Sequence, residues 1–284
     1  MRWCRIAAAF GFLLVARSLG MSQDEKPPEP ESGWRFLPDT RIFEPLLADP
    51  RWPHFSLAYA RMIRQGFPQI RDAATISLGE HVGLVEYVSD GGNRVGIGLQ
   101  PAVYGLFNLN ALSKDLVNAD YRLGVPVDFR TGPFSLEASI LHQSSHLGDE
   151  FVLEVQDQRL NLSYEATTLT LSYDLGEFRF YAGGGYLIHS VPADLEPWSA
   201  RQGIEWSSRD GGSFGPVVAI HLDEREESDW RPDLSVRAGV EFVDPRRSRR
   251  RFQILLEYYR GQDPNGQFFR ERIESIGIGI HFYF

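Results

Sequence analysis

The stretch LHQSSHLGDE, residues 141–150, concentrates side chains that can carry out nucleophilic and acid–base chemistry. His142 and Ser144 are two residues apart, so on an extended strand they project from the same face with Cα atoms roughly 6.7 Å apart. An imidazole at that reach can take the proton of a serine hydroxyl, which is the nucleophile–base pair of serine hydrolases. The spacing therefore predicts Ser144 as a nucleophile and His142 as its general base.

A third group is needed to hold the imidazole, and the following segment, RLNLSYEATTLTLSYD, offers two. Paired antiparallel with the first segment, it places Asn161 on the same face as the apolar positions Leu169 and Leu171. We expect Asn161 to orient His142, with Glu165 as the competing residue.

The acidic residues that follow suggest a metal. Asp149 and Glu150, with Glu154 nearby, are hard oxygen donors of the kind that calcium prefers, and calcium is the one cofactor considered. If the strand ends at residue 145, His146 could instead converge with Asp149 and Glu150 in a turn. The plainer alternative is that these histidines and serines are polar residues at a membrane interface and that GDE opens a solvated loop.

The elements that position these residues follow from alternation of apolar and polar side chains after residue 53. YRLGVPVDF, residues 121–129, has an apolar face and a face of Arg, Gly, Pro and Asp, which indicates a β-strand with two different environments. Twelve such segments are expected: 53–62, 74–88, 94–109, 119–130, 133–146, 160–174, 177–188, 198–206, 215–223, 233–243, 250–260 and 272–284.

The fold class predicted is all-β, a single antiparallel transmembrane β-barrel of about 12 strands. The segments are long enough to cross a bilayer when tilted, and aromatic residues stand near their ends. The chain ends within the strand IESIGIGIHFYF, which resembles the assembly signal of bacterial outer-membrane barrels. A secreted β-sandwich is the alternative. In a barrel, Phe134 and Ile140 face lipid, and His142, Ser144 and His146 continue that face.

Short connections alternate with long ones, as expected for periplasmic turns and outer loops. Charges on the opposite strand faces are balanced, so we expect a cross-linked polar lumen more than a selective pore. The charged side chains expected there are Arg94, Arg122, Arg179, Arg201, Arg237, Asp128, Glu137, Glu205, Glu241 and Glu257.

The N-terminus sets the compartment. Residues 1–21 have arginines, an apolar stretch and small residues near a cleavage point, which predicts a Sec signal peptide and hence a bacterial outer-membrane location. Residues 22–33 are expected as a disordered linker, 34–52 as a periplasmic segment that caps the barrel from below, and 53–284 as the barrel. Removing the signal removes Cys4, the only cysteine, so thiol chemistry is excluded.

The net charge of −9 disfavours a nucleic-acid partner. The partners expected are outer-membrane lipids and the outer-membrane assembly machinery, with a homodimer left open.

Two resemblances follow from these residues. His142-x-Ser144 on the lipid face of a twelve-stranded barrel, with Asn161 on the next strand, resembles outer-membrane phospholipase A, and lipid A deacylases use a similar pair. The phospholipase pattern continues Asn-Gly after the serine, whereas Ser145 and His146 stand here, which questions the oxyanion and calcium arrangement. FLPDTRIFEPLLADPRWPHFS (36–56) with HQSSHLGDE (142–150) resembles an uncharacterised bacterial outer-membrane family, a domain of unknown function (DUF1207-like).

The function predicted is an acyl-ester hydrolase of outer-leaflet lipids. The alternative is a non-enzymatic structural barrel or a small-solute channel.

Overall fold

The structure is a computed structural model that describes residues 32–64, 70–155, 162–208, 213–243 and 250–284. The expected signal peptide and almost all of the expected linker lie outside these residues. No helix in the described ranges combines the length and apolar character needed to cross a membrane. The elements, in chain order, are β1 (Gly33–Phe36), β2 (Phe55–Arg64), β3 (Asp72–Gly79), β4 (Val82–Val88), β5 (Arg94–Asn108), β6 (Leu116–Thr131), β7 (Phe134–Leu147), α1 (Asp149–Val155), β8 (Leu162–Leu175), β9 (Phe178–Val191), β10 (Trp198–Ser207), β11 (Phe214–Arg225), η1 (Glu226–Ser228), β12 (Asp233–Val243), β13 (Arg251–Gln262), η2 (Gly266–Phe268) and β14 (Arg272–Tyr283).

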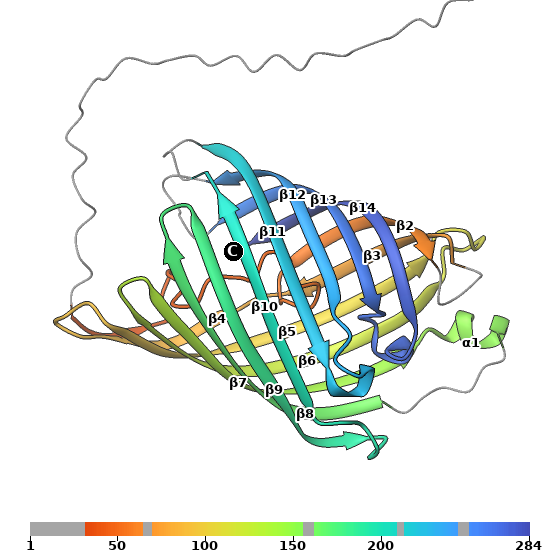
Figure 1. Cartoon of the computed structure of the whole chain (residues 1–284), viewed down its shortest axis with the longest axis horizontal. Coiled ribbons are helices and arrows are strands. Elements are labelled where there is room, and N and C mark those ends of the chain that lie inside the picture. The colour runs from red at the N-terminus through yellow and green to blue at the C-terminus, as the bar shows by residue number, and fades with distance from the viewer. Residues whose placement is uncertain (1–31, 65–69, 156–161, 209–212, 244–249) are drawn as a thin grey trace, which may run out of the picture. The chain divides into compact units, whose positions relative to one another are not determined.

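The described strands form one antiparallel sheet that closes on itself (Figure 1). Each strand from β5 to β14 pairs with the next in sequence, β14 pairs with β2, and the β5–β6 pairing completes the ring. β3 and β4 share one position, since β3 pairs with the second half of β5 and β4 with its first half. The barrel therefore has 12 strand positions, with β1 added as a short strand beside β4. The prediction of a single strand over 74–88 is therefore wrong in one respect: residues 80–81 divide it into β3 and β4.

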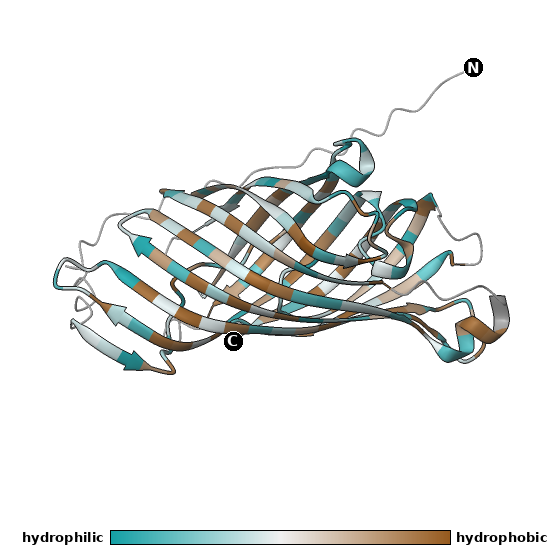
Figure 2. Cartoon of the chain, turned by 90° about the horizontal axis from the view of Figure 1, so that it is seen from below, coloured by the Kyte–Doolittle hydropathy of each residue, from teal (hydrophilic) through white to brown (hydrophobic). Residues whose placement is uncertain are grey.

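Side chains alternate between two environments along each strand, as the banding of Figure 2 shows. On β7, Phe134 and Ile140 are 54% and 59% exposed, whereas Ser135, Glu137 and Ser139 between them are buried. The apolar side chains therefore point out of the barrel and the polar ones into its lumen, as the sequence predicted.

The two ends of the barrel differ. At the turn end, short connections such as residues 132–133 join the strands, and the C-terminal residue Phe284 lies there beside Glu80. At the loop end, longer connections hold α1, η1 and η2, and α1 marks this end in Figure 1.

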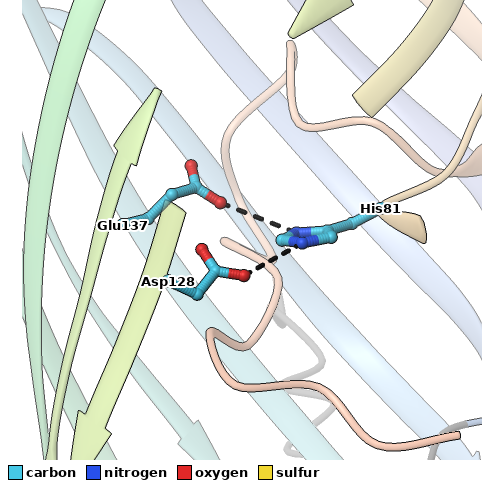
Figure 3. A group of neighbouring side chains, drawn as sticks. All are labelled: His81, Asp128 and Glu137. Atoms are coloured by element: carbon cyan, nitrogen blue, oxygen red, sulfur yellow. Dashed lines mark ion pairs between the residues drawn. The ribbon is translucent and has the colours of Figure 1, made fainter. Parts of the chain in front are cut away.

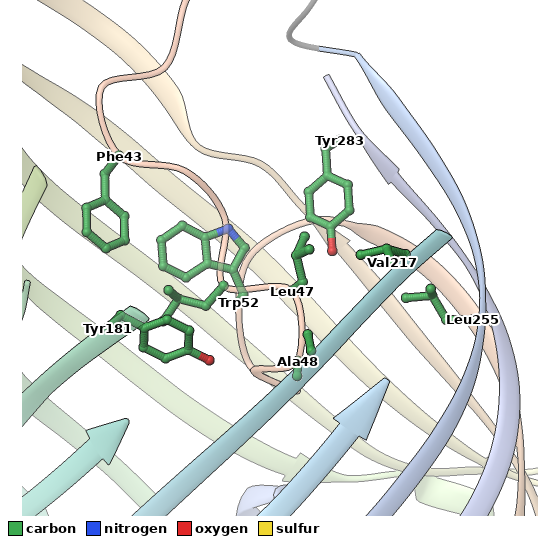
Figure 4. Close-up of a cluster of buried hydrophobic side chains, with 10 residues drawn as sticks. Phe43, Leu47, Ala48, Trp52, Tyr181, Val217, Leu255 and Tyr283 are labelled. Atoms are coloured by element: carbon green, nitrogen blue, oxygen red, sulfur yellow. The ribbon is translucent and has the colours of Figure 1, made fainter. Parts of the chain in front are cut away.

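The lumen is filled by residues 41–54, which we call the plug. Phe43, Leu46, Leu47, Ala48 and Trp52 are buried against inward-facing residues of the wall, which are Tyr181, Val217, Ala219, Leu255 and Tyr283 (Figure 4). The segment expected as a cap below the barrel thus has its second half inside the barrel. Burial of these side chains against the apolar part of the wall gives an otherwise polar lumen an apolar core.

Lumen charges hold the backbone of the plug. Arg179 donates to the carbonyl of Pro45 at 2.8 Å, and Arg237 donates to the carbonyl of Leu47 at 2.8 Å. The Leu47 N–H donates to Glu205 at 2.6 Å. Because the plug has little secondary structure, its buried backbone groups need such side-chain partners. The balanced lumen charges therefore form a cross-linked core.

Candidate active site

Three polar side chains from adjacent strands form a row on the outer face near the loop end. His142 of β7 lies directly opposite Glu165 of β8, which lies opposite His189 of β9. The Nδ1 atom of His142 is 2.7 Å from one Glu165 carboxylate oxygen, and the Nδ1 atom of His189 is 2.9 Å from the other. One carboxylate thus bridges two imidazoles on a surface that is otherwise largely apolar.

The bond to Glu165 fixes the tautomer of a neutral His142. Glu165 is an acceptor when ionised, so the proton of His142 resides on Nδ1 and the lone pair is on Nε2. Ser144 follows two residues later on the same outer face, half-buried between Tyr121 of β6 and Ser163 of β8. Within the described ranges, the Ser144 hydroxyl has no hydrogen bond to His142. The arrangement supplies a base and an orienting carboxylate beside a serine.

The remaining predicted site residues are placed differently. Asn161 lies outside the described residues. Asp149 and Glu150 occupy the first turn of α1 and are exposed. Neighbouring residues of a helix point in different directions, so this turn does not by itself converge their carboxylates on one ion. His146 lies edge-on to the Tyr121 ring, with centroids 5.7 Å apart, which places it at the end of the same outer face. The predicted calcium site stays a prediction.

His189 is a member of the row that alternation could not identify. On β9, the even-numbered residues Phe178, Phe180 and Tyr186 are exposed on the outer face. Strict alternation would therefore point the odd-numbered His189 into the lumen. The β8–β9 pairing shifts register beyond Glu165, and this irregularity places His189 on the outer face. Glu165 was recognisable from sequence as the competitor of Asn161, because it has the parity of Leu169 and Leu171.

A second polar cluster lies inside the lumen at the interruption of β3 and β4 (Figure 3). His81 faces Asp128 through Nε2 at 3.0 Å and Glu137 through Nδ1 at 3.6 Å, and all three are buried. Among the described residues, these three side chains form a group whose nitrogen and oxygen atoms lie close enough together to hold a metal ion. Each ring nitrogen faces a different carboxylate, so a protonated imidazole satisfies the cluster as well.

The fold resembles solved outer-membrane proteins. The outer membrane phospholipase A from Escherichia coli superposes with a TM-score of 0.56 at 11% identity, over 81% of this chain and 93% of that chain. The Salmonella typhi outer membrane phospholipase, a dimer with bound calcium, superposes with a TM-score of 0.57 at 12% identity, over 83% of this chain and 94% of that one. Likeness at such identities shows the fold, which is that of an outer-membrane β-barrel.

Two sequence comparisons complete this picture. The comparison with curated proteins finds no match. The model of the family described as "Protein of unknown function (DUF1207)" matches residues 33–284.

Proposed function

We propose that this chain, which belongs to the DUF1207 family, is an acyl-ester hydrolase of outer-leaflet lipids. Ser144 would be its nucleophile and His142 its general base. The observation that carries the proposal is the 2.7 Å bond between His142 Nδ1 and Glu165, on the same outer face as Ser144. Glu165 takes the orienting role there, and Asn161 stays a competing candidate.

The reaction needs few groups. The Ser144 hydroxyl oxygen attacks the acyl carbonyl carbon while its proton passes to Nε2 of His142. The Oγ–carbonyl bond forms, the ester C–O bond breaks, and the leaving alcohol takes the proton from His142. Water then attacks the acyl-serine while His142 accepts its proton. The acyl C–Oγ bond breaks, His142 returns the proton to the Ser144 oxygen, and the fatty acid is released. Glu165 remains ionised throughout and stabilises the imidazolium.

The position of the row suits a lipid substrate. Leu123 of β6 lies opposite His142, and Ile140 precedes it on the same face, and both side chains are exposed. In an outer-membrane barrel these side chains meet acyl chains, and the polar row then lies where ester groups lie. An ester there reaches Ser144 without leaving the bilayer.

The plug disfavours the channel alternative, because it occupies the lumen with packed side chains, of which Phe43 and Leu46 are fully buried. Planar-bilayer recordings test it directly. A filled lumen gives no steady conductance, whereas stable ion conductance by the full-length barrel would favour a channel.

The proposed hydrolase is tested by fatty-acid release from phospholipid in mixed micelles, with calcium and with a chelator. We expect release by the wild type and a loss of about 100-fold or more in kcat for Ser144→Ala. Ser163→Ala is the matched control, since Ser163 lies directly opposite Ser144 on the outer face.

A phosphonate that labels activated serines gives a second readout. It should modify Ser144 in the wild type and lose most of its rate in His142→Gln. Absence of fatty-acid release by the wild type in both ionic conditions would eliminate the hydrolase and leave the structural barrel. Release that Ser144→Ala retains in full would eliminate Ser144 as the nucleophile.

A further inference from the structure

A cavity of about 200 Å³ lies in the lumen at the loop end, above the plug. Asp49, Pro50 and Arg51 of the plug contribute to its lining, together with strand residues from β6 to β13 and residues of the loop-end connections around Pro197, Glu227 and Pro264. Its volume is many times that of one water molecule and below the range typical of drug-sized ligands. The cavity therefore has room for a compact organic molecule.

Four arginines line this cavity, and three of them have carboxylate partners. Arg51 pairs with Asp120 at 2.8 Å, and Arg201 lies 3.7 Å from Asp49. Arg225 pairs with two aspartates, Asp223 at 3.2 Å and Asp233 at 3.0 Å. Such pairing is expected of cations held in a lumen with restricted access to water.

Arg122 is the exception among the four. Its one hydrogen bond to a described residue runs from Nη1 to the carbonyl oxygen of Arg51, at 3.2 Å. Its Nε atom is buried without a partner, and no described carboxylate lies within 4.0 Å of its guanidinium. A guanidinium carries five N–H donors, so most of the donor capacity of Arg122 is unused. An anion in the cavity would supply an acceptor to the Nη donors of this half-buried side chain.

Apolar side chains line part of the cavity wall near Arg122, although Gln143 lies directly opposite it. Leu141 of β7, Leu162 and Ala166 of β8 and Leu187 of β9 line the same cavity. A ligand that uses both features has an anionic head at Arg122 and a short apolar body along these strands. Carboxylate geometry matches the planar fork of a guanidinium.

We propose that this cavity is a binding site for a small organic carboxylate, with Arg122 as the residue that recognises its charge. The site is separate from the outer-face row and does not depend on hydrolase activity. The two are nevertheless close through the wall, because β7 presents Leu141 and Gln143 to the cavity and His142 and Ser144 to the outside.

Calorimetry on the purified full-length barrel tests the proposal with sodium hexanoate as the probe. Hexanol is the neutral counterpart, and inorganic phosphate is an anion without an apolar body. We expect one equivalent of hexanoate to bind and Arg122→Gln to weaken this binding by at least about tenfold. Arg130→Gln is the control for the loss of one positive charge, since Arg130 pairs with Asp174 at the turn end.

A second variant guards against loss of folding, because Arg122 also holds the backbone of the plug. Ala166→Phe fills the cavity from the wall and keeps all four arginines, and it should also abolish hexanoate binding. Hexanoate binding that is unchanged in folded Arg122→Gln or in Ala166→Phe would overturn the site. Equal binding of hexanol or of phosphate would overturn its assignment to organic carboxylates.

Discussion

Nδ1 of His142 lies 2.7 Å from Oε1 of Glu165 across the β7–β8 pair, on the outer face of the barrel. Both side chains are partly exposed, His142 at 50% and Glu165 at 39%. At the hydrated level of the ester groups, water and salt screen such an exposed pair, so its stabilising contribution is small. Its principal effect is on the orientation and tautomer of the imidazole.

Glu165→Gln should therefore lower kcat by about 100-fold or more while leaving KM nearly unchanged, because the amide can still bond His142 but cannot stabilise its charged form. Fatty-acid release measured against pH checks this, since the variant should also shift the acid limb of the profile. Glu177→Gln, which alters a carboxylate bonded to Trp206 at the turn end, is the control. Full activity in Glu165→Gln would return the orienting role to Asn161.

The plug should contribute measurably to stability. Phe43 is fully buried, stacks on Trp52 with ring centroids 5.9 Å apart and lies under the Arg179 guanidinium at 4.8 Å. Phe43→Ala should lower the free energy of unfolding by about 3–5 kcal/mol. Urea unfolding followed by gel mobility measures it, with Phe36→Ala, a truncation at a 77% exposed position, as the control. A loss equal to that of Phe36→Ala would mean that the plug is not packed in solution.

Acid should weaken the plug through His54. Burial, with the neighbouring His281 and Arg237, holds the pKa of His54 well below 6.5, although the Trp52 carbonyl and Glu257 act in the opposite direction. The unfolded chain binds the proton more tightly, so the free energy of unfolding falls as pH drops below 6.5, by at most about 1.4 kcal/mol per pH unit.

Unfolding measured between pH 4 and 7 tests this expectation. His54→Gln removes the titrating group and should flatten the acid side of the curve. An acid side as steep as that of the wild type would assign the effect to another group.

Asp263 should make the free energy of unfolding change with pH in the opposite direction. It lies buried in the loop after β13, where burial, with the nearby Asp120 charge, raises its pKa from 3.8 to about 7 despite hydrogen bonds from Asn265. The folded chain binds the proton more tightly, so this contribution to stability is present below pH 3.8 and is lost as pH rises to about 7.

Asp263→Asn keeps an oxygen acceptor for Asn265 and has no charge to bury. Relative to the wild type, it should gain stability progressively from pH 4 to 7, whereas His54→Gln changes the curve in the other direction. A pH-independent difference between Asp263→Asn and wild type would show that Asp263 does not titrate in this range.

Alternation gave the barrel because an outer face and a lumen impose a period of two on every strand, and β7 carries that signal from Phe134 to Ser144. The interruption at Glu80 and His81 was not predicted, although Glu80 has the parity of the outward-facing Leu78 and breaks the apolar face there. Alternation also could not place the plug inside the lumen. Residues 41–54 have no periodicity, and their position depends on contacts with Arg179, Glu205 and Arg237 far along the chain.

Part of the candidate site could likewise be predicted from the sequence, and part could not. Parity placed His142 and Ser144 on the outer face and retained Glu165 as a partner. It failed for His189, because a register irregularity inverts the faces beyond Glu165. Irregularities of this kind arise from local backbone pairing, which leaves no mark in the order of apolar and polar residues.

The alternation of β7 also limits how this segment can change in length. Inserting or deleting one residue after Ile140 would exchange the contents of the two sides, sending Ser144 into the interior and Gln143 to the exterior. Indels in this strand should therefore be tolerated as even numbers, or at the connection beyond Leu147, and a library of single-codon insertions would map that rule along the barrel.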